Sequence, residues 1–417
     1  MSATAFSLVF VAFVLAALAW RVLLGVRQMR HVAKHRDRVP DDFAAFVPLE
    51  AHRKAADYTL DRQRVSLAET LVVDGVVLLA LTLGGGIAAI DHLSQRAFGD
   101  GYARDLATVF GVLVVTTVIA LPFDVWRTFV VEARHGFNRT TPALFALDIA
   151  KGTLLAIAIG TPLLLAVFWL VQAAGAFWWF YTWLAWIAFT VVLVMVFPRW
   201  IAPLFNRFTP LEEGELRQRI EALIERCGFH AKGLFVMDGS RRSSHGNAYF
   251  TGFGTQKRIV FFDTLIDRLT APEIEAVLAH ELGHFARGHI PRLLAVRFAL
   301  ALLLLAILGW LYRESAFYEA LGLSAPHIGA ALAGFALIIP VFTFPFQPLA
   351  SLVARRQEFE ADAFAAEHAS AADLASALAK LYRDNASTLT PDPLHSLVYD
   401  SHPPAALRID HLRRAAS

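Results

Sequence analysis

Long apolar runs separated by polar stretches dominate this chain. Seven of them are long enough to cross a bilayer as helices, which takes about 20 residues. These runs cover residues 4–26, 68–91, 105–122, 144–171, 177–198, 291–312 and 327–353. The pattern predicts a mostly α-helical, polytopic membrane protein with seven transmembrane helices. No basic segment precedes the first run and no small-residue cleavage site follows it, so we interpret it as a retained span.

A second pattern, H-E-x-x-H, stands just before the sixth run, at His280, Glu281 and His284. On a helix, positions i and i+4 share one face, so both imidazoles point toward one ion and the glutamate lies beside it. Thr270-Ala271-Pro272-Glu273 reads as a capping box that opens this helix, and Gly288 as its stop. The motif therefore lies on a helix, as metal chemistry requires.

Two histidines leave a catalytic zinc one protein ligand short, because such sites have three protein ligands and a water. The metzincin continuation is absent, since Arg287 and Ile290 replace its glycine and histidine. A downstream carboxylate is therefore expected. Glu358 and Asp362, four residues apart on a predicted helix, are the best candidates: one binds the metal while the other orients a ligating imidazole.

The region around the motif predicts a small zincin-like α+β domain. Thr209-Pro210-Leu211-Glu212 reads as a capping box opening an amphipathic helix that ends near Gly228. Three short runs, 234–237, 248–251 and 258–262, are typical of strands. The expected units are 1–205 (five spans with cytoplasmic loops), 206–290 (catalytic domain), 291–353 (two spans) and 354–417 (a soluble helical region completing the metal site).

Composition agrees with a membrane protein and limits its partners. The chain has 417 residues, 56% hydrophobic and 18% charged, whereas soluble domains average about 25% charged. A net charge of +2, without any nucleic-acid-binding signature, argues against nucleic acid as a partner. The single cysteine excludes an intramolecular disulfide.

The distribution of Lys and Arg predicts the orientation in the membrane. Residues 27–66 are rich in both and are expected to be cytoplasmic. Seven spans then place the N-terminus outside and the C-terminus inside. They also place His280 and Glu358 on the same, cytoplasmic side, because two crossings separate them.

Several further segments resemble the type I CAAX prenyl endopeptidases, which are seven-span membrane zinc proteases. The resemblance covers essentially the whole chain. It rests on His135-Gly136-Phe137-Asn138, Asn247-Ala248-Tyr249-Phe250-Thr251-Gly252, Lys257-Arg258-Ile259-Val260, Phe262-Asp263-Thr264-Leu265, the HELGH motif, Arg355 to Ala365 and Ser401-His402-Pro403-Pro404. HtpX-like membrane proteases share the zinc motif but have fewer spans.

The resemblance implies a role for each matching residue. It makes His280, His284 and Glu358 the ligands of one Zn²⁺ per chain, Glu281 the general base, and Asp362 the carboxylate that orients a ligating histidine. It places His402 and Arg408 near the scissile carbonyl and makes Asn247, Ala248, Tyr249, Phe250 and Thr251 a substrate-binding strand. Leu407 departs from the family, where an acidic residue is expected before Arg408. The family fold also implies that the spans enclose a chamber.

The expected function is therefore that of an integral-membrane zinc metalloendopeptidase that cleaves near protein C-termini, with a prenylated tail as a possible substrate. A membrane quality-control protease acting on unprenylated proteins fits the same residues. A transporter with an incidental H-E-x-x-H would need polar residues across many spans, and a di-iron hydroxylase further histidine boxes. The Ala-, Leu-, Val- and Arg-rich composition favours a bacterial inner membrane, with the endoplasmic reticulum as the eukaryotic alternative.

Overall fold

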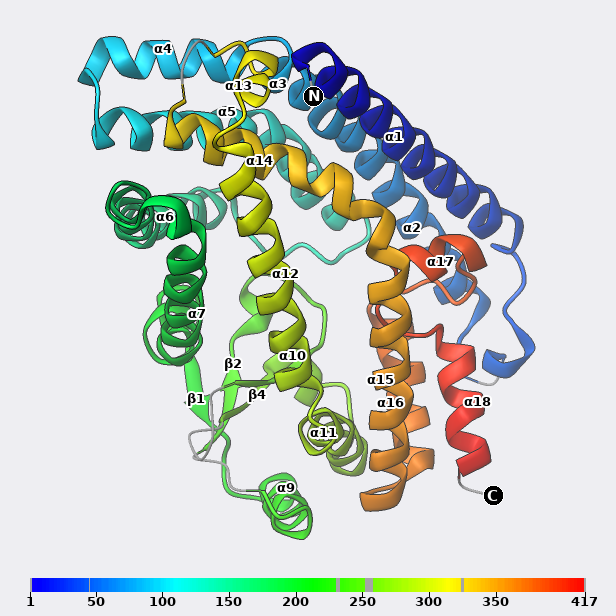
Figure 1. Cartoon of the computed structure of the whole chain (residues 1–417). Coiled ribbons are helices and arrows are strands. Elements are labelled where there is room, and N and C mark those ends of the chain that lie inside the picture. The colour runs from blue at the N-terminus through cyan, green and yellow to red at the C-terminus, as the bar shows by residue number, and fades with distance from the viewer. Residues whose placement is uncertain (1, 45, 230–232, 252–257, 324–325, 416–417) are drawn as a thin grey trace.

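Seven long apolar helical segments make up most of the molecule (Figure 1). The computed structural model describes residues 2–44, 46–229, 233–251, 258–323 and 326–415. Within them, the candidate spans are Ala3–Lys34, Leu49–Thr82, Tyr102–Glu132, Pro142–Ala173, Gly175–Phe205, His289–Leu311 and Ile328–His368. The predicted number of spans is confirmed, and the protein is an integral, multi-pass membrane protein.

The spans are built from α-helices, some of which continue through short π-helical turns. The helices before the sheet are α1 (Ala3–Lys34), α2 (Leu49–Glu69), α3 (Leu78–Thr82), α4 (Gly86–Phe98), α5 (Tyr102–Trp126), α6 (Pro142–Ala173), α7 (Trp178–Val196) and α8 (Ala202–Phe205). The π-helical segments are Thr70–Val77, Arg127–Glu132 and Phe197–Ile201.

The remaining helices come after the first strand. They are α9 (Glu215–Arg226), α10 (Asp263–Ile266), α11 (Ala271–Ala286), α12 (His289–Leu311), α13 (Ser315–Ala320), α14 (Ile328–Thr343), α15 (Gln347–His368), α16 (Ala371–Asp384), α17 (Pro393–Tyr399) and α18 (Ala405–Ala415). Helices α14 and α15 form one continuous span, so the domain boundary expected after residue 353 falls inside α15.

The second and third spans differ from their predicted positions. The second runs from Leu49 to Thr82 instead of 68–91, because Gly85 takes a positive φ of 76° and ends the segment before α4 begins. The third continues ten residues beyond its expected end at Pro122, which the helix accommodates. The predicted limits of both spans follow the apolar runs alone. A helix that continues as an amphipathic or kinked segment beyond its apolar run is therefore longer than predicted.

A four-stranded sheet lies between the fifth and sixth spans in the chain. Its order is β1 (Phe208–Pro210), β2 (Leu234–Met237), β4 (Arg258–Phe262) and β3 (Ala248–Thr251). Strand β2 pairs in parallel with β4, and the other two pairs are antiparallel. Strand β3 therefore lies at one edge. The capping box predicted at Thr209 is wrong: Thr209 and Pro210 belong to β1, and the amphipathic helix begins only at Glu215.

One hydrophobic core joins the sheet to the helices around it. Ile259 and Phe261 of β4, Ile274 and Leu278 of α11 and Leu374 of α16 are almost fully buried in this core. Helix α15 contributes Phe364 and Ala365 to the same core. The core therefore fixes α11 against both the sheet and α15, which are the elements that carry the candidate site.

Candidate active site

Helices α11 and α15 lie side by side (Figure 1), and the missing side chain of Gly283 permits their close approach. A Cβ atom on Gly283 would lie 2.9 Å from the Cα atom of Ala361, which is closer than real Cβ contacts come. The predicted capping box is present at the start of α11, where Thr270 N–H donates to Glu273 at 2.8 Å. Gly288, in the left-handed conformation, separates α11 from α12 as expected.

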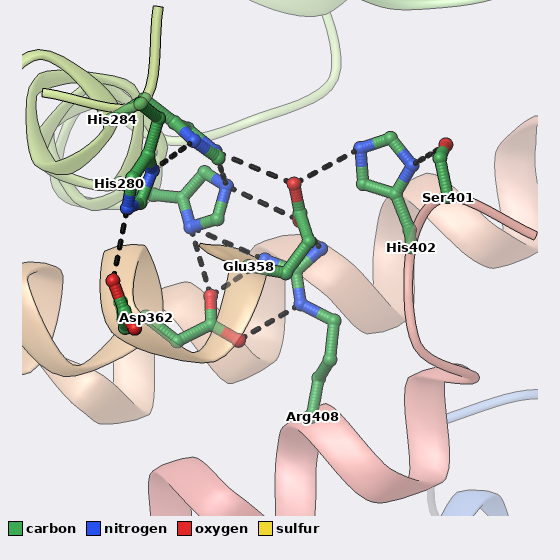
Figure 2. A network of polar contacts seen from close by, with 9 residues as sticks. His280, His284, Glu358, Asp362, Ser401, His402 and Arg408 are labelled. Atoms are coloured by element: carbon green, nitrogen blue, oxygen red, sulfur yellow. Dashed lines mark hydrogen bonds and ion pairs between the residues drawn. The ribbon is translucent and has the colours of Figure 1, made fainter. Parts of the chain in front are cut away.

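Three candidate ligand atoms converge between these helices (Figure 2). His280, His284 and Glu358 each offer one atom, and these atoms all lie within 4.8 Å of one another. The two Nε2 atoms of the histidines lie 3.3 Å apart, and the Glu358 carboxylate lies 3.5 Å from His280 Nε2 and 3.3 Å from His284 Nε2. Glu358 Oε2 is buried and accepts no hydrogen bond. Two imidazoles and a carboxylate make up a donor set that fits a zinc ion, and Arg408 Nη1 lies 3.2 Å from the Oε2 atom of that carboxylate.

Asp362 and Arg408 support His280 from behind. The Asp362 carboxylate lies 2.8 Å from His280 Nδ1 and is fully buried. Arg408 donates to both Asp362 oxygens, at 2.9 and 2.6 Å, and lies 3.2 Å from Glu358. Burial opposes protonation of His280, but hydrogen bonds to Asp362 and Glu358 outweigh it and raise its pKa to about 9. A bound metal ion competes with that proton.

A second support, which the sequence reasoning missed, holds His284. Its Nδ1 lies 2.9 Å from Nδ1 of His289, the first residue of α12. His289 Nε2 in turn lies 3.1 Å from Glu360. With His284 Nε2 on a metal, one arrangement of protons satisfies this chain: His284 donates to His289, and His289 donates to Glu360. No helical spacing reveals it, because Gly288 starts a new helix between the two histidines.

Glu281 opens onto a cavity of about 290 Å³ beside the three ligand atoms. The lining residues are Tyr249, Phe250, Glu281, His284, Phe285, His289, Ile290, Leu293, Gln357 and His402. The candidate base, one candidate metal ligand and two residues of the predicted substrate strand therefore line the same cavity. His402 stands at the same cavity with a side chain that is 60% exposed, 3.4 Å from Glu358.

Arg408 does not line this cavity. Its side chain is 5% exposed and is held by Asp362 and Glu358. Burial by itself would lower the pKa of Arg408, but the carboxylates of Asp362 and Glu358 outweigh this effect and raise it. Arg408 therefore remains a cation. An acidic residue at position 407 is not needed to hold Arg408, because Asp362 and Glu358 already pair with it, while Leu407 is exposed. Of the two residues expected near a scissile carbonyl, only His402 lines the cavity.

Strand β3 presents a free edge beside the cavity. Phe262 N–H donates to the Asn247 carbonyl at 2.9 Å, so residues 247 and 262 form a hydrogen-bonded pair. In an antiparallel ladder such pairs alternate, which turns the backbone groups of Ala248 and Phe250 away from β4. Within the described residues no strand pairs with that edge. The Asn247 side chain accepts from Ala248 N–H at 2.8 Å.

Comparison with known proteins identifies the class. Residues 210–416 match the family model "Peptidase family M48", and residues 28–207 match "CAAX prenyl protease N-terminal, five membrane helices". The two matches define a membrane-embedded metallopeptidase, which replaces the transporter and di-iron alternatives.

Relatives along the full length narrow the class. The chain is 36% identical to "CAAX prenyl protease 1 homolog" of Oryza sativa, over 97% of this chain and 96% of the relative. It is 31% identical to the Homo sapiens homologue of that name, over 94% and 92%. The crystal structure of S. mikatae Ste24p superposes with a TM-score of 0.91 at 31% identity, covering 97% and 98%. The chain belongs to the type I CAAX prenyl protease family.

Proposed function

We propose that the chain is a zinc-dependent endopeptidase that cleaves near the C-termini of CAAX-type proteins. The observation that carries the proposal is the convergence of His280, His284 and Glu358 within 4.8 Å, beside a cavity that Glu281 lines. One zinc ion per chain is the metal that this donor set favours. The names of the relatives supply the substrate class.

A zinc ion at these ligands supplies Lewis acidity, which lowers the pKa of water and polarises a carbonyl. Glu281 accepts a proton from the attacking water and later delivers it to the leaving amine. His402 lies on the side of Glu358 opposite to His280 and His284 (Figure 2). It donates a hydrogen bond to the oxygen of the scissile carbonyl as negative charge develops there. Asp362 accepts a hydrogen bond from the Nδ1–H of His280 and so orients the ring, and Arg408 pairs with both Asp362 and Glu358.

Strand β3 holds the substrate backbone in this proposal. The outward groups of Ala248 and Phe250 are available to an added strand once the Asn247 side chain swings away. Substituting proline at Ala248 removes an outward N–H donor without touching a metal ligand. We expect Ala248→Pro to impair cleavage of long and short peptides alike at normal zinc content. An unchanged kcat/KM would refute pairing at this edge.

The direct test of the chemistry is Glu281→Gln, which preserves shape but not basicity. We expect full zinc content and a kcat lower by at least ~10²-fold, the low end for general acid–base catalysis. Glu225→Gln is the matched control, because Glu225 lies on α9, outside the cavity lining. An active Glu281→Gln enzyme would remove Glu281 from the reaction.

A second candidate is quality control of unprenylated membrane proteins. It is favoured by the free edge of β3, because main-chain pairing reads little side-chain chemistry. Matched peptides ending in Cys-Val-Ile-Ala, with and without an S-farnesyl group, separate the two. CAAX processing predicts a higher kcat/KM for the farnesylated peptide, whereas quality control predicts no preference.

We further propose that the site faces the cytoplasm of a bacterial inner membrane, or the cytosol if the membrane is the endoplasmic reticulum. The support is the cluster of Lys and Arg between residues 27 and 66. Arg38→Cys and Ser240→Cys in a Cys227→Ser background test the orientation with an impermeant thiol reagent. Labelling of either cysteine from the non-cytoplasmic side would contradict it.

A further inference from the structure

A cluster of polar and aromatic side chains outside the metal site surrounds His245, three residues before β3. The His245 ring stacks on Phe137 at a centroid distance of 4.5 Å and an angle of 25°. Its Nε2 lies 3.5 Å from a Glu132 oxygen and 3.5 Å from the Tyr58 hydroxyl, which donates to Glu132 at 2.5 Å. Tyr58 and Phe137 are buried, at 3% and 4% exposure. This cluster takes no part in the mechanism above.

The partners of His245 come from the membrane-spanning part of the chain. Tyr58 belongs to α2, Glu132 ends the third span, and Phe137 lies in the connection to the fourth span. Backbone contacts take the same course: Ser244 N–H donates to the Phe137 carbonyl at 3.2 Å, and Asn138 forms an isolated bridge with Ser243. The segment entering β3 is therefore attached to the spans.

Asn385 binds the same segment from the side of α11, the metal helix, which carries His280 and His284. Its Oδ1 accepts from Gly246 N–H at 3.1 Å, and its Nδ2 donates to the Gly246 carbonyl at 3.4 Å. The same Oδ1 lies 3.4 Å from His245 Nδ1. Asn385 caps α16, whose Leu374 and Ala377 share the core with Leu278 and Ala279 of α11. The contacts of His245 with the spans and those of Asn385 with α16 thus meet at residues 245 and 246.

These two sets of contacts lie directly before the strand that we expect to hold the substrate. Asn247 forms the first rung to β4, and Tyr249 and Phe250 reach the cavity that Glu281 lines. A strand advances about 3.4 Å per residue, so a slip of one residue brings a neighbouring peptide bond to the reacting position. The position of the edge strand along its axis therefore selects the bond that is cut.

We propose that His245 and Asn385 are positioning residues that set the register of a substrate on β3 and so choose its scissile bond. This inference rests on the proposed peptidase function and deepens it. His245 ties the strand to the membrane spans, and Asn385 ties it to the metal helix. The position of the cleaved bond is then fixed relative to both the bilayer and the metal site. This suits a substrate that is held in the membrane near its own C-terminus.

The test uses the full-length, zinc-loaded protein and the S-farnesylated peptide ending in Cys-Val-Ile-Ala, with products mapped by mass spectrometry. Wild type should cut one bond. His245→Ala and Asn385→Ala should keep their zinc, lose roughly 10–100-fold in kcat/KM as expected for a misplaced substrate, and release additional fragments cut at adjacent bonds. His245→Phe, which keeps the stack on Phe137 but not the polar contacts, should lie between.

His368→Ala is the matched control, because His368 also stacks on a phenylalanine, Phe364, at 4.0 Å and 15°. It should cut the wild-type bond at the wild-type rate. A single unchanged cleavage site in both His245→Ala and Asn385→Ala would overturn the proposal, whether or not the rate falls. If His245→Ala does not fold, Asn385→Ala decides.

Failure of the proposed function gives a different result, since wild type would then cut no peptide. In that case peptide affinity, measured in the Glu281→Gln background, still reports whether His245 positions β3 to hold a peptide. His245→Ala should weaken binding of the peptide there while His368→Ala does not. Equal affinities in these two variants would contradict the proposal.

Discussion

The two histidines of the H-E-x-x-H motif rest on supports of different character. His280 contacts Asp362 directly; this carboxylate is 0% exposed and is neutralised by Arg408, itself 5% exposed. His284 reaches its carboxylate, Glu360, only through His289, and Glu360 is 35% exposed. The support of His280 is a buried ion pair. The support of His284 is a chain of two hydrogen bonds that ends at a partly exposed carboxylate.

The difference between the two supports predicts which of them affects folding and which affects only metal affinity. A buried charge that loses its partner is strongly destabilising, because desolvation is no longer compensated. An exposed carboxylate is screened and contributes little. The His280 side should therefore couple metal binding to folding, whereas the His284 side should adjust metal affinity without affecting the fold.

Asp362→Ala is expected to have the largest effect. It leaves Arg408 buried without its bidentate partner, which costs about 3–5 kcal/mol in the free energy of unfolding, and zinc affinity should fall by ~10–100-fold. Thermal unfolding and zinc titration of the purified variant measure both quantities. A stable Asp362→Ala protein with normal zinc affinity would remove the contrast between the two supports.

The pH dependence of metal binding should come from the His280 side. In the metal-free protein the His280 pKa is raised to about 9, above the ordinary value of 6.5. The proton therefore stabilises the metal-free fold fully below pH 6.5, and this contribution is lost as pH rises through about 9. Zinc must displace that proton, so its affinity should rise about tenfold per pH unit in this window.

Competition titrations with a chelator measure this slope. Asp362→Asn removes the hydrogen bond that most raises the His280 pKa, so the affinity should level off at a lower pH than in wild type. Glu360→Gln should leave the levelling point unchanged. A shift of equal size in both variants would show that the two supports act alike.

Gly283→Ala tests the contact between α11 and α15 that brings the two supports together. Its Cβ would press on the Ala361 backbone at 2.9 Å, and such overpacking costs about 1–3 kcal/mol. We expect a lower melting temperature and partial loss of zinc. Gly152→Ala is the control, because among the described residues no atom outside its own stretch of helix lies within 4 Å of the added Cβ. A loss of equal size there would discount the helix contact.

Glu360→Gln should have the smallest effect. The Glu360 carboxylate, which contacts His289 and Arg356, is partly exposed, so the free energy of unfolding should change by less than about 1 kcal/mol. Zinc affinity should fall by no more than ~10-fold, the low end for an outer partner of a ligand. A larger loss than in Asp362→Ala would reverse the comparison.

Much of this arrangement was predictable because it depends on local patterns. Seven apolar runs predict seven spans, and the capping box at Thr270 and the glycine at 288 delimit the metal helix. The three predicted strands occur at the expected residues, since short runs rich in β-branched and aromatic side chains favour extended chain. The triad of candidate ligands was predictable from spacing and from resemblance.

Features that depend on tertiary contacts were not predictable. The capping box at Thr209 matches a local pattern, but pairing of β1 with β2 overrides it. The second span begins at Leu49 because its first turns bury Ala55, Ala56 and Tyr58 against other parts of the protein, which hydropathy does not detect. The relay through His289 and the anchors of His245 join residues distant in the chain or on different helices.

Elemental analysis of purified protein measures whether His280, His284 and Glu358 hold one zinc ion. Wild type should contain one zinc per chain, and His284→Ala should lose nearly all of it. His289→Ala removes only the support of His284 and should keep a reduced but measurable share. Wild-type zinc content in His284→Ala would contradict the ligand assignment and the account built on it.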